Sequence, residues 1–158
     1  MKTTFAISGN AVLRISPAAM QTLLEFRQAK GANEAGGILI GREYASGSIV
    51  IEEASAPSLS DKAGPTWFDR SQSAAQQIVD ERWQRSNGEL IYIGEWHSHP
   101  EDVPRPSSRD RKMINNMLCE TSMEIDFLIL IIVGRTAIWV GQRTRKELLE
   151  ICVQKTPS

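Results

Sequence analysis

Cysteine and histidine are scarce in this chain of 158 residues, which contains two of each. The cysteines, Cys119 and Cys152, lie far apart and form no C-x-x-C pair. This pattern argues against a disulfide scaffold, and a structural zinc module would favour cysteine ligands that are absent here. We expect both thiols to be reduced, buried and inert in a cytoplasmic protein.

Long hydrophobic runs and an excess of either charge are also missing. Lysine and arginine number 18 against 19 acidic residues, for a formal net charge of -1, whereas nucleic-acid binders usually carry a basic excess or a basic face. The longest apolar run, 127–133, is too short to span a bilayer and predicts a buried strand. We therefore expect a cytoplasmic protein that binds neither membranes nor nucleic acids, with a single domain over residues 1–158.

The patterned segments alternate between strand and helix, which predicts a layered α+β (or α/β) domain. Strands are predicted at 3–7, 11–15, 36–41, 49–54, 90–99, 125–133 and 136–141. Helices are predicted from Pro17 to Gly31, over about 70–86 with an apolar face of Ala75, Ile78, Val79 and Trp83, and from Ser107 to about Leu118. We expect a long loop over 55–68. The tail 145–153 has the charge pattern of a helix, although 151–153 also fits a strand.

Both histidines, His97 and His99, lie two residues apart in one predicted strand. Side chains with this spacing share a face of an extended strand, so both imidazoles point at one ion. Catalytic zinc takes about three protein ligands and leaves a position for water. The proline-rich segment 100–106 turns the chain back and brings Asp110 into the first turn of the next helix. Two imidazoles and a carboxylate suit zinc better than magnesium, which prefers oxygen ligands.

The segment from Ser107 to Asp110 also fits a capping box, in which the serine caps the helix and the aspartate bonds back to its backbone. This interpretation and the metal site are compatible, because one helical turn can serve both.

A hydrolytic site of this kind also needs a carboxylate as general base. The candidates are Glu34, Glu95, Glu101 and Asp102. Glu95 shares the strand and the face of the histidines, whereas Glu34 precedes Gly36-Gly37, where the backbone can approach a substrate closely. Position alone does not choose among them.

The spacing H-x-H-x7-S-x2-D that ends at Asp110, together with the upstream Glu34 and the strand GGILIG at 36–41, resembles the JAB/JAMM (MPN-domain) metallopeptidases. The resemblance extends over about residues 12–142 and is strongest to the short bacterial JAB deconjugases of CBASS anti-phage operons. It implies the JAB/MPN (cytidine-deaminase-like) fold, a mixed β-sheet flanked by helices. It also implies that Glu34 is the base and that Ser107 stabilises the oxyanion, with Zn2+ held by His97, His99 and Asp110.

The implied reaction is hydrolysis of the amide or isopeptide bond after the C-terminus of a ubiquitin-like or otherwise conjugated protein. In CBASS operons, such a peptidase removes conjugates from a cyclic-oligonucleotide synthase and is linked to E1- and E2-like enzymes. The substrate would arrive extended, in a groove that Trp67 and Phe68 line unless they anchor the loop to the core. The alternatives are a non-catalytic MPN scaffold and a peptidase that processes a sulfur-carrier or phage tail protein.

Overall fold

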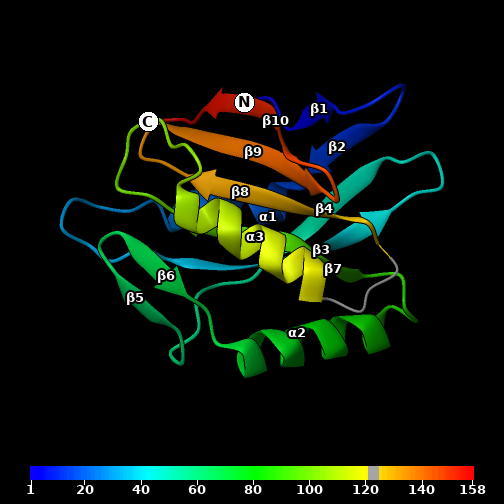
Figure 1. The fold of residues 1–158 in the computed structure, drawn as a ribbon, viewed down its shortest axis with the longest axis horizontal. Helices are drawn as coiled ribbons and strands as arrows, with labels where there is room; N and C mark the ends of the chain where they lie inside the picture. The colour runs from blue at the N-terminus through cyan, green and yellow to red at the C-terminus, as the bar shows by residue number, and fades with distance from the viewer. Residues whose placement is uncertain (121–124) are drawn as a thin grey trace.

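The computed structural model describes residues 1–120 and 125–158. It contains one large mixed sheet (Figure 1). The strands of this sheet are β1 (Thr4–Ala6), β2 (Val12–Ile15), β3 (Gly36–Glu43), β4 (Ile49–Ala54), β7 (Ile91–Ser98), β8 (Phe127–Val133), β9 (Ala137–Thr144) and β10 (Leu148–Lys155). Their order across the sheet is β1-β2-β4-β3-β7-β8-β9-β10. The pairs β2–β4 and β7–β8 are parallel and the other neighbours are antiparallel.

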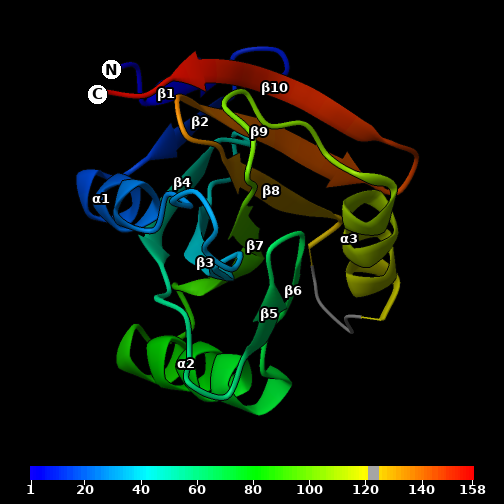
Figure 2. The same ribbon diagram turned by 90° about the vertical axis from the view of Figure 1, so that its left-hand side faces the viewer.

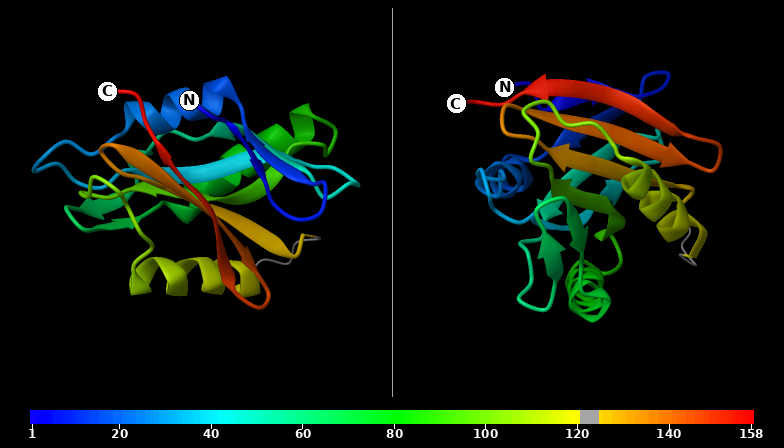
Figure 3. Two further views of the ribbon diagram at one scale, coloured as in Figure 1. Left: turned by 90° about the horizontal axis from the view of Figure 1, so that it is seen from above. Right: turned by 60° about the vertical axis from the view of Figure 1, so that its left-hand side comes forward.

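Helices cover both faces of this sheet, which confirms the α+β class predicted from the sequence. They are α1 (Pro17–Glu25), α2 (Gln72–Arg85) and α3 (Ser108–Glu120). Figure 2 shows α1 and α3 on opposite sides of the sheet, where α1 contacts β4 and α3 contacts β8 and β9, while α2 contacts β3 and β7. The sheet curls so strongly that its two edge strands, β1 and β10, approach each other (Figure 3). The strand order places β7 in the middle of the sheet, between β3 and β8.

Helix α1 begins where the sequence predicts and ends earlier. The Ser16 hydroxyl accepts a hydrogen bond from the Ala19 amide, and Pro17 occupies the first turn. The predicted end at Gly31 is wrong, because the helix stops at Glu25. Tertiary contacts explain the early end: the ring of Phe26 packs 6.0 Å from that of Trp96, and the buried Gln28 accepts a hydrogen bond from the Ser98 hydroxyl of β7.

The predicted loop over 55–68 contains a small hairpin, formed by β5 (Lys62–Gly64) and β6 (Trp67–Asp69). Glycines permit its close packing. A Cβ atom on Gly64 would lie 2.1 Å from the Trp67 indole nitrogen, and one on Gly36 of β3 would lie 2.5 Å from the Phe68 ring. Phe68 thus rests on the start of β3, which attaches the hairpin to the main sheet.

The C-terminal tail is the strand β10, so the prediction of a helix over 145–153 is wrong and the strand alternative is correct. Its backbone pairs with β9 along most of its length, interrupted by one irregularity. The Glu150 carboxylate also accepts a hydrogen bond from the Trp139 indole at 2.7 Å. Pairing with an available sheet edge therefore outweighs the helical charge pattern of the tail.

The apolar face of α2 packs against the core through Ala75, Ile78 and Val79, whereas Trp83 is 54% exposed. The expectation that both cysteines are buried is wrong. Both cysteines are free, but Cys119 is exposed and Cys152 is half-buried, where burial raises the pKa of its thiol to about 11. Among the described residues, no helix has the length and apolar character needed to cross a membrane.

Candidate metal centre and active site

Strand β7 and helix α3 bring the predicted metal ligands together. His97 lies near the end of β7, paired with Gly36 of β3 and with Ile132 of β8. His99 follows the strand, and its amide donates to the Val133 carbonyl at 2.9 Å. Asp110 lies in the first turn of α3, as predicted. The two imidazoles are thus held by the rigid centre of the sheet, and the carboxylate reaches them from a neighbouring helix.

The three side chains converge on one point. The Nε2 atoms of His97 and His99 lie 3.2 Å apart. The Asp110 carboxylate is 2.8 Å from the first and 3.0 Å from the second. All three residues are buried, and their ligand atoms lie within 4.8 Å of one another. Two imidazole nitrogens aimed at the same carboxylate form a donor set that fits a zinc ion.

The carboxylate of Asp110 contacts the two imidazoles and also caps the N-terminus of its own helix. Its Oδ2 accepts from the Ser107 amide at 2.8 Å, while the Ser107 hydroxyl accepts from the Asp110 amide at 3.1 Å. Burial alone would raise the pKa of Asp110, but hydrogen bonds from His97 and His99 lower it well below its ordinary value. The group is therefore an anion at neutral pH. The capping box and the cluster of His97, His99 and Asp110 coexist, as the sequence suggested.

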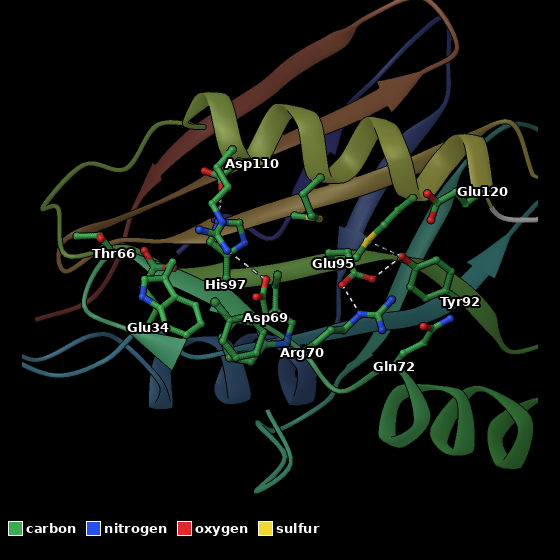
Figure 4. Close-up of a pocket in the computed structure, with 16 residues that line it drawn as sticks. Glu34, Thr66, Asp69, Arg70, Gln72, Tyr92, Glu95, His97, Asp110 and Glu120 are labelled. Carbon is green, nitrogen blue, oxygen red and sulfur yellow. Dashed lines mark hydrogen bonds and ion pairs between the residues drawn. The ribbon is translucent and has the colours of Figure 1, made fainter. Parts of the chain in front are cut away.

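Glu34 lines the same cavity as His97 and Asp110 (Figure 4). It lies in the loop before β3 and is only 6% exposed. Burial raises the pKa of its carboxyl, although the nearby His97 and His99 oppose this shift. Within residues 1–120 and 125–158, the Glu34 carboxylate forms no ion pair within 4.0 Å. It is therefore a carboxylate with a raised pKa and without an ion-pair partner in the described part of the chain.

The cavity beside these residues has a volume of about 400 Å³. One wall comes from the β5–β6 hairpin, with Trp67 and Phe68, and the other from α3, with Met113 and Met117. The structure therefore supports both interpretations of the hairpin aromatics, since Phe68 lines the cavity and also packs against Gly36. The exposed Arg109 lies over the Trp67 ring at 5.7 Å and pairs with Asp69 at 3.3 Å.

The far end of the cavity contains a largely buried ion pair between Arg70 and Glu95. The guanidinium of Arg70 contacts the buried carboxylate of Glu95 at 2.6 Å, and the Tyr92 hydroxyl donates to the other carboxylate oxygen. Burial raises the pKa of Glu95, although Arg70 opposes this shift. Figure 4 shows Tyr92 and Glu95 on the same strand as His97, with Arg70 beside them, and all three line the same cavity.

Comparisons with known proteins agree with this fold and this arrangement. A family model described as prokaryotic homologs of the JAB domain matches residues 16–147. The chain belongs to the prokaryotic JAB family.

Relatives of this JAB chain include proteins named CD-NTase/cGAS isopeptidase. One from Escherichia coli is 37% identical over 120 residues, which are 76% of this chain and 74% of the relative. Another, from Pseudomonas aeruginosa, is 33% identical over 141 residues, 89% of this chain and 88% of the relative. The solution structure of a protein from Desulfitobacterium hafniense superposes with a TM-score of 0.59 at 23% identity, covering 87% of this chain and 88% of the other, which supports the fold.

Three residues that the sequence offered as candidates do not line the cavity. Ser107 is exposed and lies outside the residues that line the cavity, with its hydroxyl turned to the start of α3. Glu101 and Asp102 are exposed and also lie outside that lining. Arg70 was not predicted from the sequence, because no local pattern indicates that it pairs with a strand residue 25 positions later.

Proposed function

We propose that this JAB chain is a zinc-dependent isopeptidase with one domain over residues 1–158. Its reaction is hydrolysis of the amide bond after the C-terminus of a conjugated protein. The proposed substrate is a conjugate of a cyclic-oligonucleotide synthase (CD-NTase), in the cytoplasm of a bacterium whose anti-phage system includes E1- and E2-like enzymes. The names of the relatives support the substrate. The convergence of His97, His99 and Asp110 opposite Glu34 supports the chemistry.

The metal would be held by His97, His99 and Asp110. When bound, Zn2+ supplies an acidified water molecule as nucleophile and an electrophilic centre for the scissile carbonyl. The buried, anionic Asp110 contributes the negative charge that makes this donor set selective for a cation. Because both histidines sit at the end of a central strand, their side chains are preorganised, which reduces the conformational entropy lost on binding.

Glu34 acts in this proposal as the general base and then as the general acid. It takes a proton from the attacking water and delivers it to the leaving amine. A carboxyl with a raised pKa is better matched to this exchange at neutral pH than an ordinary one. The Ser107 hydroxyl donates to the oxyanion of the tetrahedral intermediate. Because this oxygen accepts a bond from the Asp110 amide, its own proton remains available for donation.

The substrate's C-terminal segment would enter extended, between the hairpin and α3. Strand β6 pairs only with β5 in the part of the chain that the structure describes, so its other edge can pair with an added strand. Trp67, Phe68, Met113 and Met117 give this passage apolar walls. The acyl carbon of the substrate would then lie at the end where Glu34 meets the metal ligands.

The decisive experiment uses a CD-NTase fused through its C-terminus to green fluorescent protein. The zinc-loaded wild-type chain is expected to cleave at the junction, as mass spectrometry of the products would show, and Glu34→Ala is expected not to. Fusions of a sulfur-carrier protein and of a phage tail protein provide the alternative substrates. A zinc-loaded wild type that cleaves none of the fusions would instead favour the non-catalytic scaffold.

A further inference from the structure

A buried glutamine connects the segments that surround Glu34. Gln28 lies in the loop between α1 and β3 and is 4% exposed. Its amide nitrogen donates to the Ala32 carbonyl at 2.8 Å and to the Pro65 carbonyl at 2.9 Å. Its amide oxygen accepts from the Ser98 hydroxyl at 3.3 Å. One side chain therefore bonds to the loop before β3, to the tip of the hairpin and to the strand that carries the histidines.

The bond to Ser98 extends to the residue beside Glu34. The Ser98 hydroxyl accepts from the Ala35 amide at 2.9 Å, and the Ser98 amide donates to the Ala35 carbonyl at 2.8 Å. Ser98 is fully buried between His97 and His99. The backbone next to the proposed base is thereby fixed to the backbone between the two proposed ligands.

The hairpin completes this bracing. The Glu34 amide donates to the Gly64 carbonyl at 2.8 Å, next to the Pro65 carbonyl that Gln28 binds. The segment 32–35 is thus held on one side through Ala32, on the other through Ala35, and in the middle by the hairpin. Gln28 takes part directly in the first of these contacts and through Ser98 in the second.

Only a primary amide satisfies this arrangement. Both partners of the Gln28 nitrogen are carbonyl oxygens, which accept and cannot donate, so the amide orientation follows from its surroundings. A glutamate would place a carboxylate oxygen against two carbonyl oxygens, and these groups repel because none of them can donate a hydrogen bond. A methionine would fill the space but leave the Ala32 and Pro65 carbonyls without this donor.

We infer that Gln28 is a positioning residue for Glu34. It does not line the cavity and touches no reacting atom. Gln28 acts by holding the loop that carries Glu34 in register with β7. This inference rests on the proposed function, because it presumes that Glu34 is the base. Misplacing a catalytic group by about 1 Å can cost on the order of a hundredfold in rate. Loss of this amide should therefore lower kcat and spare KM and zinc binding.

The test compares Gln28→Met with Ser55→Ala. Ser55 is similarly buried, at 7% exposure, and its hydroxyl accepts from the Ile38 amide at 2.9 Å rather than from the segment 32–35. Both variants are expected to lower the melting temperature. Gln28→Met should lower kcat on the fusion substrate by roughly tenfold to a hundredfold, with KM and zinc content unchanged. Ser55→Ala should keep the wild-type kcat.

A Gln28→Met protein that keeps the wild-type kcat overturns the inference, and so does one whose defect is a loss of zinc or a rise in KM alone. Ser98→Ala, which removes a single oxygen, gives a second test if the methionine variant does not fold. It is expected to lower kcat in the same direction while retaining zinc, and a wild-type kcat in that variant overturns the inference as well. If zinc-loaded Glu34→Ala cleaves like wild type, the proposed base itself is wrong.

Discussion

Each end of the cavity contains a buried glutamate, but only one of the two forms an ion pair in the part of the chain that the structure describes. At one end, Glu34 is buried beside the imidazoles with no ion-pair partner among the described residues. At the other end, Glu95 is equally buried but pairs with Arg70 and accepts the Tyr92 hydroxyl. Both carboxylates are candidates for the base in the sequence. The contrast shows that burial does not decide between them, whereas the neighbours of each carboxylate do.

A paired carboxylate makes a poor base, because protonating it leaves the buried guanidinium without its counter-charge. Glu95 instead stabilises the fold, because it joins Arg70, which lies between the hairpin and α2, to the strand β7 that contains His97. Glu34 retains the freedom to gain and lose a proton. The following variants test this division between a chemical end and a structural end.

The largest effect is expected for His99→Ala. Loss of one of three ligands should remove the zinc and all detectable cleavage. Mass spectrometry should find about one zinc ion per wild-type chain and none in the variant. Circular dichroism should remain close to wild type, because the sheet core does not depend on the ion. Cleavage at the wild-type rate would show that the metal assignment is wrong.

Glu34→Gln should come next. The amide keeps the size of the side chain and cannot accept the proton, so kcat should fall by about 10²–10⁴-fold while zinc binding persists. Steady-state kinetics on the fusion substrate, with zinc content measured in the same sample, separate this loss from a loss of metal. Near-normal turnover would remove the distinction between the two ends.

Glu95→Gln is the matched variant at the structural end. Leaving the largely buried Arg70 without its partner should destabilise the fold by about 1–3 kcal/mol in urea unfolding. Its kcat should fall far less than that of Glu34→Gln. The double variant Arg70→Met/Glu95→Met should recover much of the lost stability, because it removes both charges. A kcat as low as that of Glu34→Gln would assign Glu95 to the chemistry.

The smallest effect is expected for Arg109→Ala at the rim. This side chain is 58% exposed and lies over Trp67, so its removal should raise KM by about twofold to fivefold. Stability and kcat should stay close to wild type. A change in kcat larger than the change in KM would indicate that the rim acts on the reacting atoms.

The elements that were predicted correctly are those whose signals lie close together in the chain. The helix caps at Ser16 and Ser107 are set within three residues of their partners, and the apolar run 127–133 is a strand that is buried throughout. The end of α1 and the hairpin at 62–69 were missed, and the strand β10 was predicted only as an alternative over 151–153. The first two depend on partners far away in the sequence, Trp96 for the end of α1 and β3 for the hairpin. The strand β10 instead pairs with β9 directly before it, a pairing that the helical charge pattern of the tail did not indicate.

The candidate site divides in the same way. The sequence by itself determined the grouping of the two histidines and Asp110, because the two-residue period of a strand and the turn before a capped helix are local geometry. Only the tertiary structure decided that Glu95 is paired with Arg70, that Glu34 faces the imidazoles, and that Gln28 braces its loop. These relations join residues 25 to 70 positions apart, and the charge and hydrogen bonds of such neighbours exist only once the chain has folded.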